Sequence, residues 1–177
     1  AMFDQRGVDA IFIPLQVTPE RLAAGIAGLR QLRDFAGFCV TMPHKTAVAK
    51  LCHELLPNAQ ACGVVNAVRI DADGRMIGET FDGVAMVKAI AAHRSLAGDT
   101  RVLLVGAGGV AKAIAVALGL AGIGQLAIAY RTQANADAPA DTVARAAPTC
   151  KLEASTLRDP AGFDIVINAT SLGVNND

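Results

Sequence analysis

A glycine-rich turn between two apolar runs has the residue types and the spacing of a phosphate-binding loop. Residues 102–105 are four consecutive apolar residues, which suits a parallel strand covered on both faces, and 111–121 continues at helical spacing. Gly106 permits a tight turn, and Gly108 lets the backbone approach a pyrophosphate, while the helix that follows offers unpaired N–H groups. We therefore expect a nucleotide cofactor to contact this turn, at Gly106, Ala107, Gly108, Gly109, Val110 and Ala111.

The residues that close the turn leave one simpler interpretation open. Gly109 and Ala113 are small enough for the predicted helix to pack closely on the preceding strand. A plain strand-to-helix turn without a ligand is therefore the alternative, and the flanking strand and helix make the nucleotide site the better interpretation.

The elements around this turn predict an α/β fold. In chain order we expect a strand at 10–13, a helix that begins at Thr18, Pro19 and Glu20, a strand at 38–41, a helix at 46–56, a β-hairpin of 64–70 and 76–78, and a helix from Asp82 to about Leu96. Strands at 125–129 and 163–168 follow the glycine turn, and the polar residues 133–140 between them indicate a loop. We predict an α/β domain over 1–97 and a Rossmann-type dinucleotide-binding domain over 98–177, both incomplete.

Composition limits the partners that this chain can have. The 177 residues contain 16 basic and 16 acidic side chains without a basic block, so no electrostatic feature favours nucleic acid. The apolar runs are too short to span a membrane, and no secretion signal opens the sequence, which predicts a cytoplasmic protein without a membrane partner. Four cysteines lack metal spacing with the three histidines, so we expect reduced thiols and no metal: Cys39, Cys52, Cys62 and Cys150.

Five ordered motifs carry a family resemblance that spans nearly the whole chain. They are Val40-Thr41-Met42-Pro43-His44-Lys45, Gly63-Val64-Val65-Asn66-Ala67, Phe81-Asp82-Gly83, the glycine turn, and Asn168-Ala169-Thr170-Ser171-Leu172-Gly173. In this order they resemble the shikimate dehydrogenase family. The resemblance implies that the domain over 1–97 binds a cyclic hydroxy acid and that the Rossmann domain brings a nicotinamide cofactor to it. It also leads us to expect a serine-containing substrate loop before Ala1 and a glutamine-bearing helix after Asp177.

The resemblance implies roles for individual residues, each beside a simpler alternative. Lys45 matches the family's catalytic base, and Asp82 matches the aspartate that orients it, although Asp82 also precedes a predicted helix and could serve as its N-cap. Thr41 and Asn66 match positions that contact the substrate, or they are turn and strand-end polar groups. The cofactor positions that the resemblance adds after the last strand are Asn168, Thr170 and Ser171.

Two departures from the family pattern concern the substrate. Thr80 and Phe81 stand where the family has asparagine and threonine, and Cys39 replaces an asparagine before the first motif. Phe81 brings apolar bulk to the predicted site, and Thr80 offers one hydroxyl instead of an amide. The resemblance implies shikimate or 3-dehydroshikimate as the substrate, and the altered residues leave a related ring acid such as quinate, or a less hydroxylated analogue, as the alternative.

The residues after the second Rossmann strand indicate the cofactor. NAD enzymes place an acidic residue there to bind the ribose hydroxyl, whereas an arginine suits a 2′-phosphate. Arg131 and Thr132 occupy this place, so NADP is expected and NAD remains possible; a solvated loop charge is the alternative for Arg131.

Two other classes of function share parts of this pattern. A glycine turn after a strand also occurs in methyltransferases, which do not explain the motif around Lys45 or the motif around Asp82. A non-catalytic module that binds a dinucleotide or a shikimate-like ligand is the other alternative, and it would leave Lys45 and Asp82 unpaired.

Overall fold

The computed structural model describes residues 2–130, 137–155 and 159–172, in two compact units of residues 1–35 and 36–177. The first unit contains helix α1 (Met2–Gln5), the 3-10 helix η1 (Pro19–Arg21) and helix α2 (Leu22–Leu29). Thr18 is extended before Pro19, whose fixed backbone angle suits the first helical position. The predicted helix start is therefore confirmed.

The strand predicted at 10–13 does not form. Ile11 and Phe12 are 85% and 66% exposed, and residues 10–13 belong to no sheet ladder in the described parts of the chain. An apolar β-branched run has a local preference for extended backbone, but a strand also requires a partner for its N–H and C=O groups.

The second unit begins with a mixed sheet of four short strands. Its elements are β1 (Gly37–Cys39), α3 (Lys45–Leu51), β2 (Glu54–Leu55), α4 (Pro57–Cys62), β3 (Ala67–Ile70) and β4 (Met76–Glu79). The strand order is β1-β3-β4-β2, and the antiparallel pairing of β3 with β4 confirms the predicted hairpin. The helix predicted at 46–56 instead ends at Leu51, because Cys52 is extended and β2 pairs with β4.

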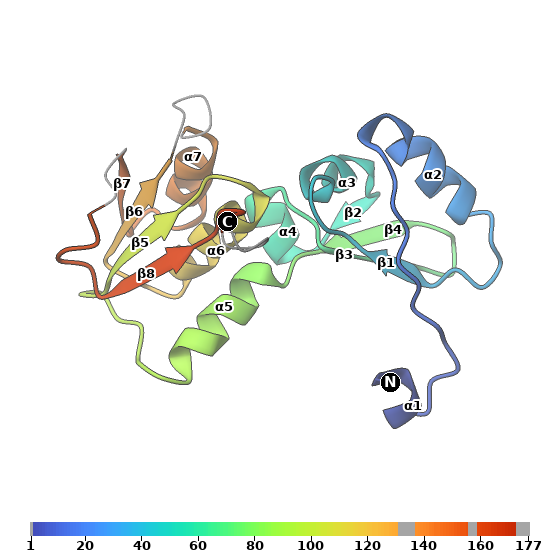
Figure 1. The fold of residues 1–177 in the computed structure, drawn as a ribbon, viewed down its shortest axis with the longest axis horizontal. Coiled ribbons are helices and arrows are strands. Elements are labelled where there is room, and N and C mark those ends of the chain that lie inside the picture. Colours follow the sequence, from blue (N-terminus) through green and yellow to red (C-terminus); the bar gives the residue numbers. More distant parts are fainter. Residues whose placement is uncertain (1, 131–136, 156–158, 173–177) are drawn as a thin grey trace. The chain divides into compact units, whose positions relative to one another are not determined.

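Helix α5 (Asp82–Ala91) leads into a second, parallel sheet. This part contains β5 (Arg101–Val105), α6 (Gly109–Leu120), β6 (Gln125–Ala129), α7 (Asp137–Ala146), β7 (Lys151–Ser155) and β8 (Ile165–Asn168). The order β7-β6-β5-β8 is the 3-2-1-4 order of a doubly wound nucleotide-binding sheet. In Figure 1 the two sheets are separate groups of arrows, with α4 and α6 between them. The predicted α/β fold with a Rossmann-type sheet is confirmed.

The connection between β6 and β8 contains more structure than the sequence pattern predicts. Residues 137–140, which we predicted as loop, begin α7, and β7 was not predicted at all. Helix α7 packs closely on α6, because a Cβ on Gly119 would lie 3.4 Å from the Cγ1 of Val143 and 2.7 Å from the Cβ of Ala147, the residue that directly follows α7. This contact between helices is what favours helix in an Ala- and Asp-rich segment whose own sequence is equally typical of a loop.

The main core lies along β5, α6 and β6. Buried apolar side chains from these elements and from α7 form one cluster that includes Val102, Leu104, Ile114, Leu118, Leu126, Ile128 and Val143. No helix in the described ranges is long and apolar enough to cross a membrane. The core thus holds β5 and α6 rigidly, and with them the glycine turn that joins them.

Candidate active site

The starts of two helices bring a lysine and an aspartate into contact. Lys45 is the first residue of α3 and Asp82 is the first residue of α5. The Lys45 Nζ donates to the Asp82 Oδ2 at 2.7 Å, and the two side chains are 13% and 21% exposed. A partly buried ion pair with this short separation holds the ammonium in one place while leaving one side of it open to solvent.

Asn66 holds the other oxygen of Asp82. Its Nδ2 donates to the Asp82 Oδ1 at 2.7 Å, and its Oδ1 accepts the backbone N–H of Phe81 at 3.1 Å. Because α5 begins at Asp82 with no side-chain cap, the interpretation of Asp82 as an N-cap is wrong. The Asp82 carboxylate instead joins Lys45 to Asn66.

Thr41 lies in the turn before α3. Its carbonyl accepts the backbone N–H of His44 at 3.0 Å, and the residue is exposed. Thr41 therefore lies next to the start of the helix that carries Lys45.

A close helix crossing positions the start of α5. A Cβ on Gly83 would overlap the carbonyl oxygen of Ala113 and would lie 2.7 Å from the Cβ of Ala117, both on α6. Gly83 therefore lets the first turn of α5 rest directly on α6. The sequence analysis assigned no role to Gly83, because its packing partner Ala113 lies thirty residues further along the chain.

The glycine turn has the shape of an anion site. Gly106 has φ +122, and a Cβ there would lie 2.8 Å from the carbonyl oxygen of Ala169, so only glycine fits. The space where a Cβ on Gly108 would lie is open, and α6 begins after Gly108 without a side-chain cap. Uncapped N–H groups at the start of a twelve-residue helix are suited to bind a phosphate.

We predicted that Gly109 packs on the preceding strand, and this prediction is wrong. A Cβ there would make ordinary contacts with Val64 at 3.6 Å and with Lys45 and Thr46 at 3.8 Å. As the first residue of α6, Gly109 faces the segments that carry the lysine rather than the body of the sheet. The glycine turn and the Lys45–Asp82 pair are therefore neighbours.

The segment after β8 lies beside the glycine turn, but its side chains bond to one another. Asn168 accepts the Thr170 N–H at 3.0 Å and the Thr170 hydroxyl at 2.7 Å, and it donates to the Leu172 carbonyl at 3.2 Å. Asn168 therefore shapes this loop. Ser171 is exposed, whereas Arg131 and Thr132 lie outside the described residues.

One carboxylate that the sequence analysis did not single out is built into the same region. Glu79, at the end of β4, is only 9% exposed, and it accepts N–H groups from the start of α4 and from Thr80. The sequence analysis missed Glu79 because it did not predict α4, although Pro57 and Gly63 stand at the start and end of this helix, where such residues are typical.

Three of the four cysteines are buried or partly buried, and Cys39 is exposed. Burial raises the pKa of the Cys62 and Cys150 thiols, and all four cysteines are free. In the described part of the chain, no group of three or more histidine, cysteine or acidic side chains is arranged to hold a metal ion.

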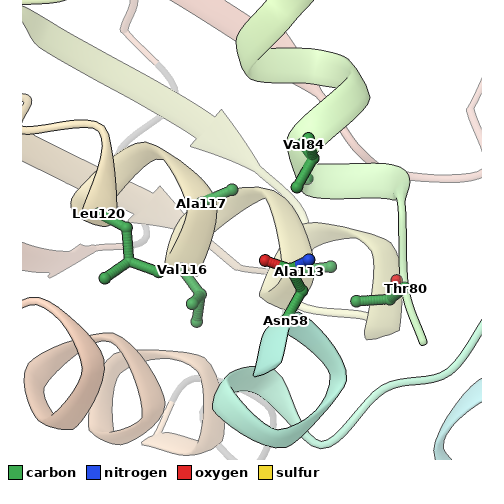
Figure 2. A pocket seen from close by; sticks show the side chains of 8 residues that line it. Asn58, Thr80, Val84, Ala113, Val116, Ala117 and Leu120 are labelled. Carbon is green, nitrogen blue, oxygen red and sulfur yellow. The ribbon is translucent and has the colours of Figure 1, made fainter. Parts of the chain in front are cut away.

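Thr80 carries a buried hydroxyl with no hydrogen-bond partner among the described residues. Figure 2 shows its side chain at a small hollow on α6, opposite Leu120 and Val116. We expect Thr80→Val to raise the free energy of unfolding by about 1 kcal/mol, because an unpaired buried polar group is destabilising. Denaturant unfolding measures this change.

The matched control is Thr100→Val. Thr100 is 2% exposed, and its hydroxyl accepts the Ala97 N–H at 3.0 Å, so this substitution should destabilise the protein by about 1 kcal/mol. Equal destabilisation by both substitutions would show that the Thr80 hydroxyl has a partner after all.

The parallel sheet and its glycine turn define a Rossmann-type nucleotide-binding fold, and two family models match the chain. The shikimate dehydrogenase substrate-binding domain matches residues 1–68, and shikimate / quinate 5-dehydrogenase matches residues 89–173. The chain therefore belongs to the shikimate dehydrogenase family, as its five motifs predicted.

Individual relatives agree with this assignment. The chain is 36% identical to the NADP(+) shikimate dehydrogenase of Geobacter sp. (strain M21) over all of its own length and 63% of that protein. It is similar to the crystal structure of 5-ketofructose reductase of Gluconobacter sp. strain CHM43, with 34% identity, a TM-score of 0.82 and coverage of 97% and 62% of the two chains. Shikimate 5-dehydrogenase from Listeria monocytogenes in complex with shikimate and NAD has 30% identity, a TM-score of 0.82 and coverage of 97% and 62%.

Proposed function

We propose that the protein containing this chain is an NAD(P)-dependent dehydrogenase that transfers a hydride between NADP and a secondary alcohol of a cyclic hydroxy acid. The observation that carries the proposal is the Lys45–Asp82 ion pair of 2.7 Å, which lies next to the first residue of the phosphate-binding helix. A site for a nucleotide and a site for proton transfer are both needed for this reaction, and the residues proposed for the two sites lie next to each other.

The residues of the glycine turn fit a dinucleotide. Gly106 provides the turn, the open space at Gly108 admits a pyrophosphate, and the N–H groups at the start of α6 are free of a side-chain cap. NADP, when bound, supplies or accepts the hydride. Residues 107–111 are proposed to contact it, together with Thr170 and Ser171.

Lys45 is proposed as the group that moves the proton. When a ketone is reduced, the Lys45 ammonium donates a proton to the carbonyl oxygen, and when the alcohol is oxidised, the Lys45 amine accepts that proton. Asp82 orients the Nζ through the 2.7 Å contact, and Asn66 in turn fixes Asp82. The pairing of Lys45 with Asp82 is what a module without catalytic activity would not require.

The substrate class rests on the residues around this pair. Thr41 and the remaining hydrogen-bonding capacity of Asn66 are proposed to bind hydroxyl or carboxylate groups of the substrate. Phe81 is 55% exposed beside Asp82, which favours a substrate that presents fewer hydroxyls at that position than shikimate does. The relatives include enzymes named for shikimate and for 5-ketofructose, so ring acids and keto sugars are both worth testing.

A turnover screen on the full-length protein tests this proposal. Shikimate, quinate, less hydroxylated ring acids and 5-ketofructose are each supplied with NADP(H) and with NAD(H), and the change in nicotinamide absorbance is followed. We expect turnover of at least one ring hydroxy acid with NADP. Tight NADP binding without turnover of any of these compounds would favour a ligand-binding module, and preferential binding of S-adenosylmethionine would favour a methyltransferase.

Arg131 is proposed to select NADP over NAD. Loss of a hydrogen bond to a charged group costs about 1.5–3 kcal/mol, so Arg131→Ala should weaken NADP binding by about tenfold or more. The affinity for NAD should change little, because NAD lacks the 2′-phosphate. Titration with both cofactors measures the two dissociation constants, and an equal loss for both would contradict this role.

We further propose that residues 1–97 form the substrate-binding domain and 98–177 the cofactor-binding domain. The four-stranded mixed sheet and the four-stranded parallel sheet are separate, which supports a boundary in the segment after α5. A cytoplasmic location is proposed because all four cysteines are free, which fits a reducing compartment.

A further inference from the structure

Glu79 is a buried carboxylate whose two oxygens meet three N–H donors. Its Oε1 accepts the backbone N–H of Ala59 at 2.8 Å and that of Thr80 at 2.7 Å, and its Oε2 accepts the Asn58 Nδ2 at 3.3 Å. A buried carboxylate is costly unless such partners are present. The three donors therefore hold the Glu79 side chain in one conformation.

Two of these donors come from the start of α4. Ala59 is the third residue of that helix, and no side chain of the preceding N-cap residue bonds to it. Glu79 thus takes the place of a cap from a strand twenty residues away, at the positive end of the helix. The far end of α4 leads through Gly63 into the segment that carries Asn66.

Glu79 also contacts the two segments that hold Asp82. Its carboxylate accepts the N–H of Thr80, which enters the turn before α5, and its backbone carbonyl accepts the N–H of Asn66 at 3.0 Å. Asn66 then bonds to Phe81 and to Asp82. Figure 2 shows Asn58 on α4 and Thr80 on the segment that enters α5, both beside α6.

We propose that Glu79 is a positioning residue for the Lys45–Asp82 pair, an inference that rests on the proposed dehydrogenase function. The hydrogen bonds of Glu79 connect the start of α4 to the turn between β4 and α5. They thereby fix the positions of Asn66 and Asp82 relative to Lys45. Glu79 does not touch the substrate or the cofactor in this role. Its influence passes through the hydrogen bonds of Thr80 and Asn66.

Glu79→Ala should lower kcat by about 10- to 100-fold, because small displacements of catalytic groups have effects of that size. The NADP dissociation constant should stay within about threefold of the wild-type value, since the variant leaves the glycine turn that is proposed to bind the cofactor unchanged, whereas the substrate KM should rise because Asn66 is also proposed to bind the substrate. Steady-state kinetics and cofactor titration on the full-length protein measure these quantities. The control is Glu54→Ala, on the neighbouring strand β2, where Glu54 is exposed and should leave kcat unchanged.

Conservative variants separate positioning from mere stability. Glu79→Gln keeps an oxygen that accepts from Ala59 and Thr80, so it should recover most of the lost kcat. Glu79→Asp withdraws the carboxylate from α4 and should lower kcat by the factor expected for Glu79→Ala. It therefore provides the test if the alanine variant does not fold. A wild-type kcat in Glu79→Ala or in Glu79→Asp, or a Gln variant as slow as the Ala variant, would overturn the proposal.

Amide hydrogen exchange tests the same inference without turnover. In Glu79→Ala the Phe81 N–H, which donates to Asn66, should exchange at least about tenfold faster, whereas the strand β5 amides should keep their protection. If the wild-type protein turns over none of the tested substrates, the proposed function fails while this measurement still tests Glu79. Unchanged exchange at Phe81 would overturn the positioning role even if the enzyme is active.

Discussion

Lys45→Met is expected to lower kcat by about 10²–10⁴-fold, which is the usual contribution of general acid–base catalysis. Methionine fills a similar volume but cannot transfer a proton, and the glycine turn should still bind the cofactor. Steady-state kinetics on the substrate that the screen identifies measures kcat, and fluorescence titration measures the NADP dissociation constant. Normal turnover in this variant would remove Lys45 from the mechanism.

The control for this substitution lies on the same helix. Lys50 is exposed in the last turn of α3, so Lys50→Met should leave kcat unchanged. Asp82→Asn should also slow turnover, because the amide replaces the anionic partner of the Lys45 ammonium. The double variant should lose much less than the product of the two single effects, since groups that act as a unit are not additive. Fully multiplicative losses would indicate independent roles.

Gly83→Ala is expected to destabilise the protein by about 1–3 kcal/mol, the range for overpacking in a close contact. The added methyl group would overlap the Ala113 carbonyl on α6, so α5 must move away. Because Asp82 is the preceding residue, kcat should fall as well. Denaturant unfolding and steady-state kinetics measure the two effects.

A second glycine provides the comparison. Gly28 lies in α2, and a Cβ there would have nothing within 4 Å, so Gly28→Ala should raise the free energy of unfolding by about 0.5–1 kcal/mol. Wild-type stability and wild-type kcat in Gly83→Ala would contradict the close crossing of α5 and α6.

Local sequence patterns determined the elements whose contacts lie close along the chain. The apolar run before Gly106, the glycine turn and the Ala-rich helix after it predicted β5 and α6, and the alternation on both sides of a Gly-containing turn predicted the β3–β4 hairpin. Ordered motifs also identified the family and paired Lys45 with Asp82 as residues that should act together. These features depend on backbone preferences and on short-range periodicity, which one segment carries by itself.

Only the tertiary structure showed which residues distant in the sequence contact one another. The sequence left Asp82 open between an N-cap and a partner of Lys45, and the 2.7 Å contacts to Lys45 and Asn66 exclude the cap. Residues 10–13 look like a strand but lie outside any sheet, whereas β7 and the buried Glu79 gave no local signal and α4 was missed although Pro57 and Gly63 bound it. The physical reason is the same in each case. A strand, a short helix or a buried carboxylate is stable only when its hydrogen-bond partners are in place, and here those partners come from distant parts of the chain.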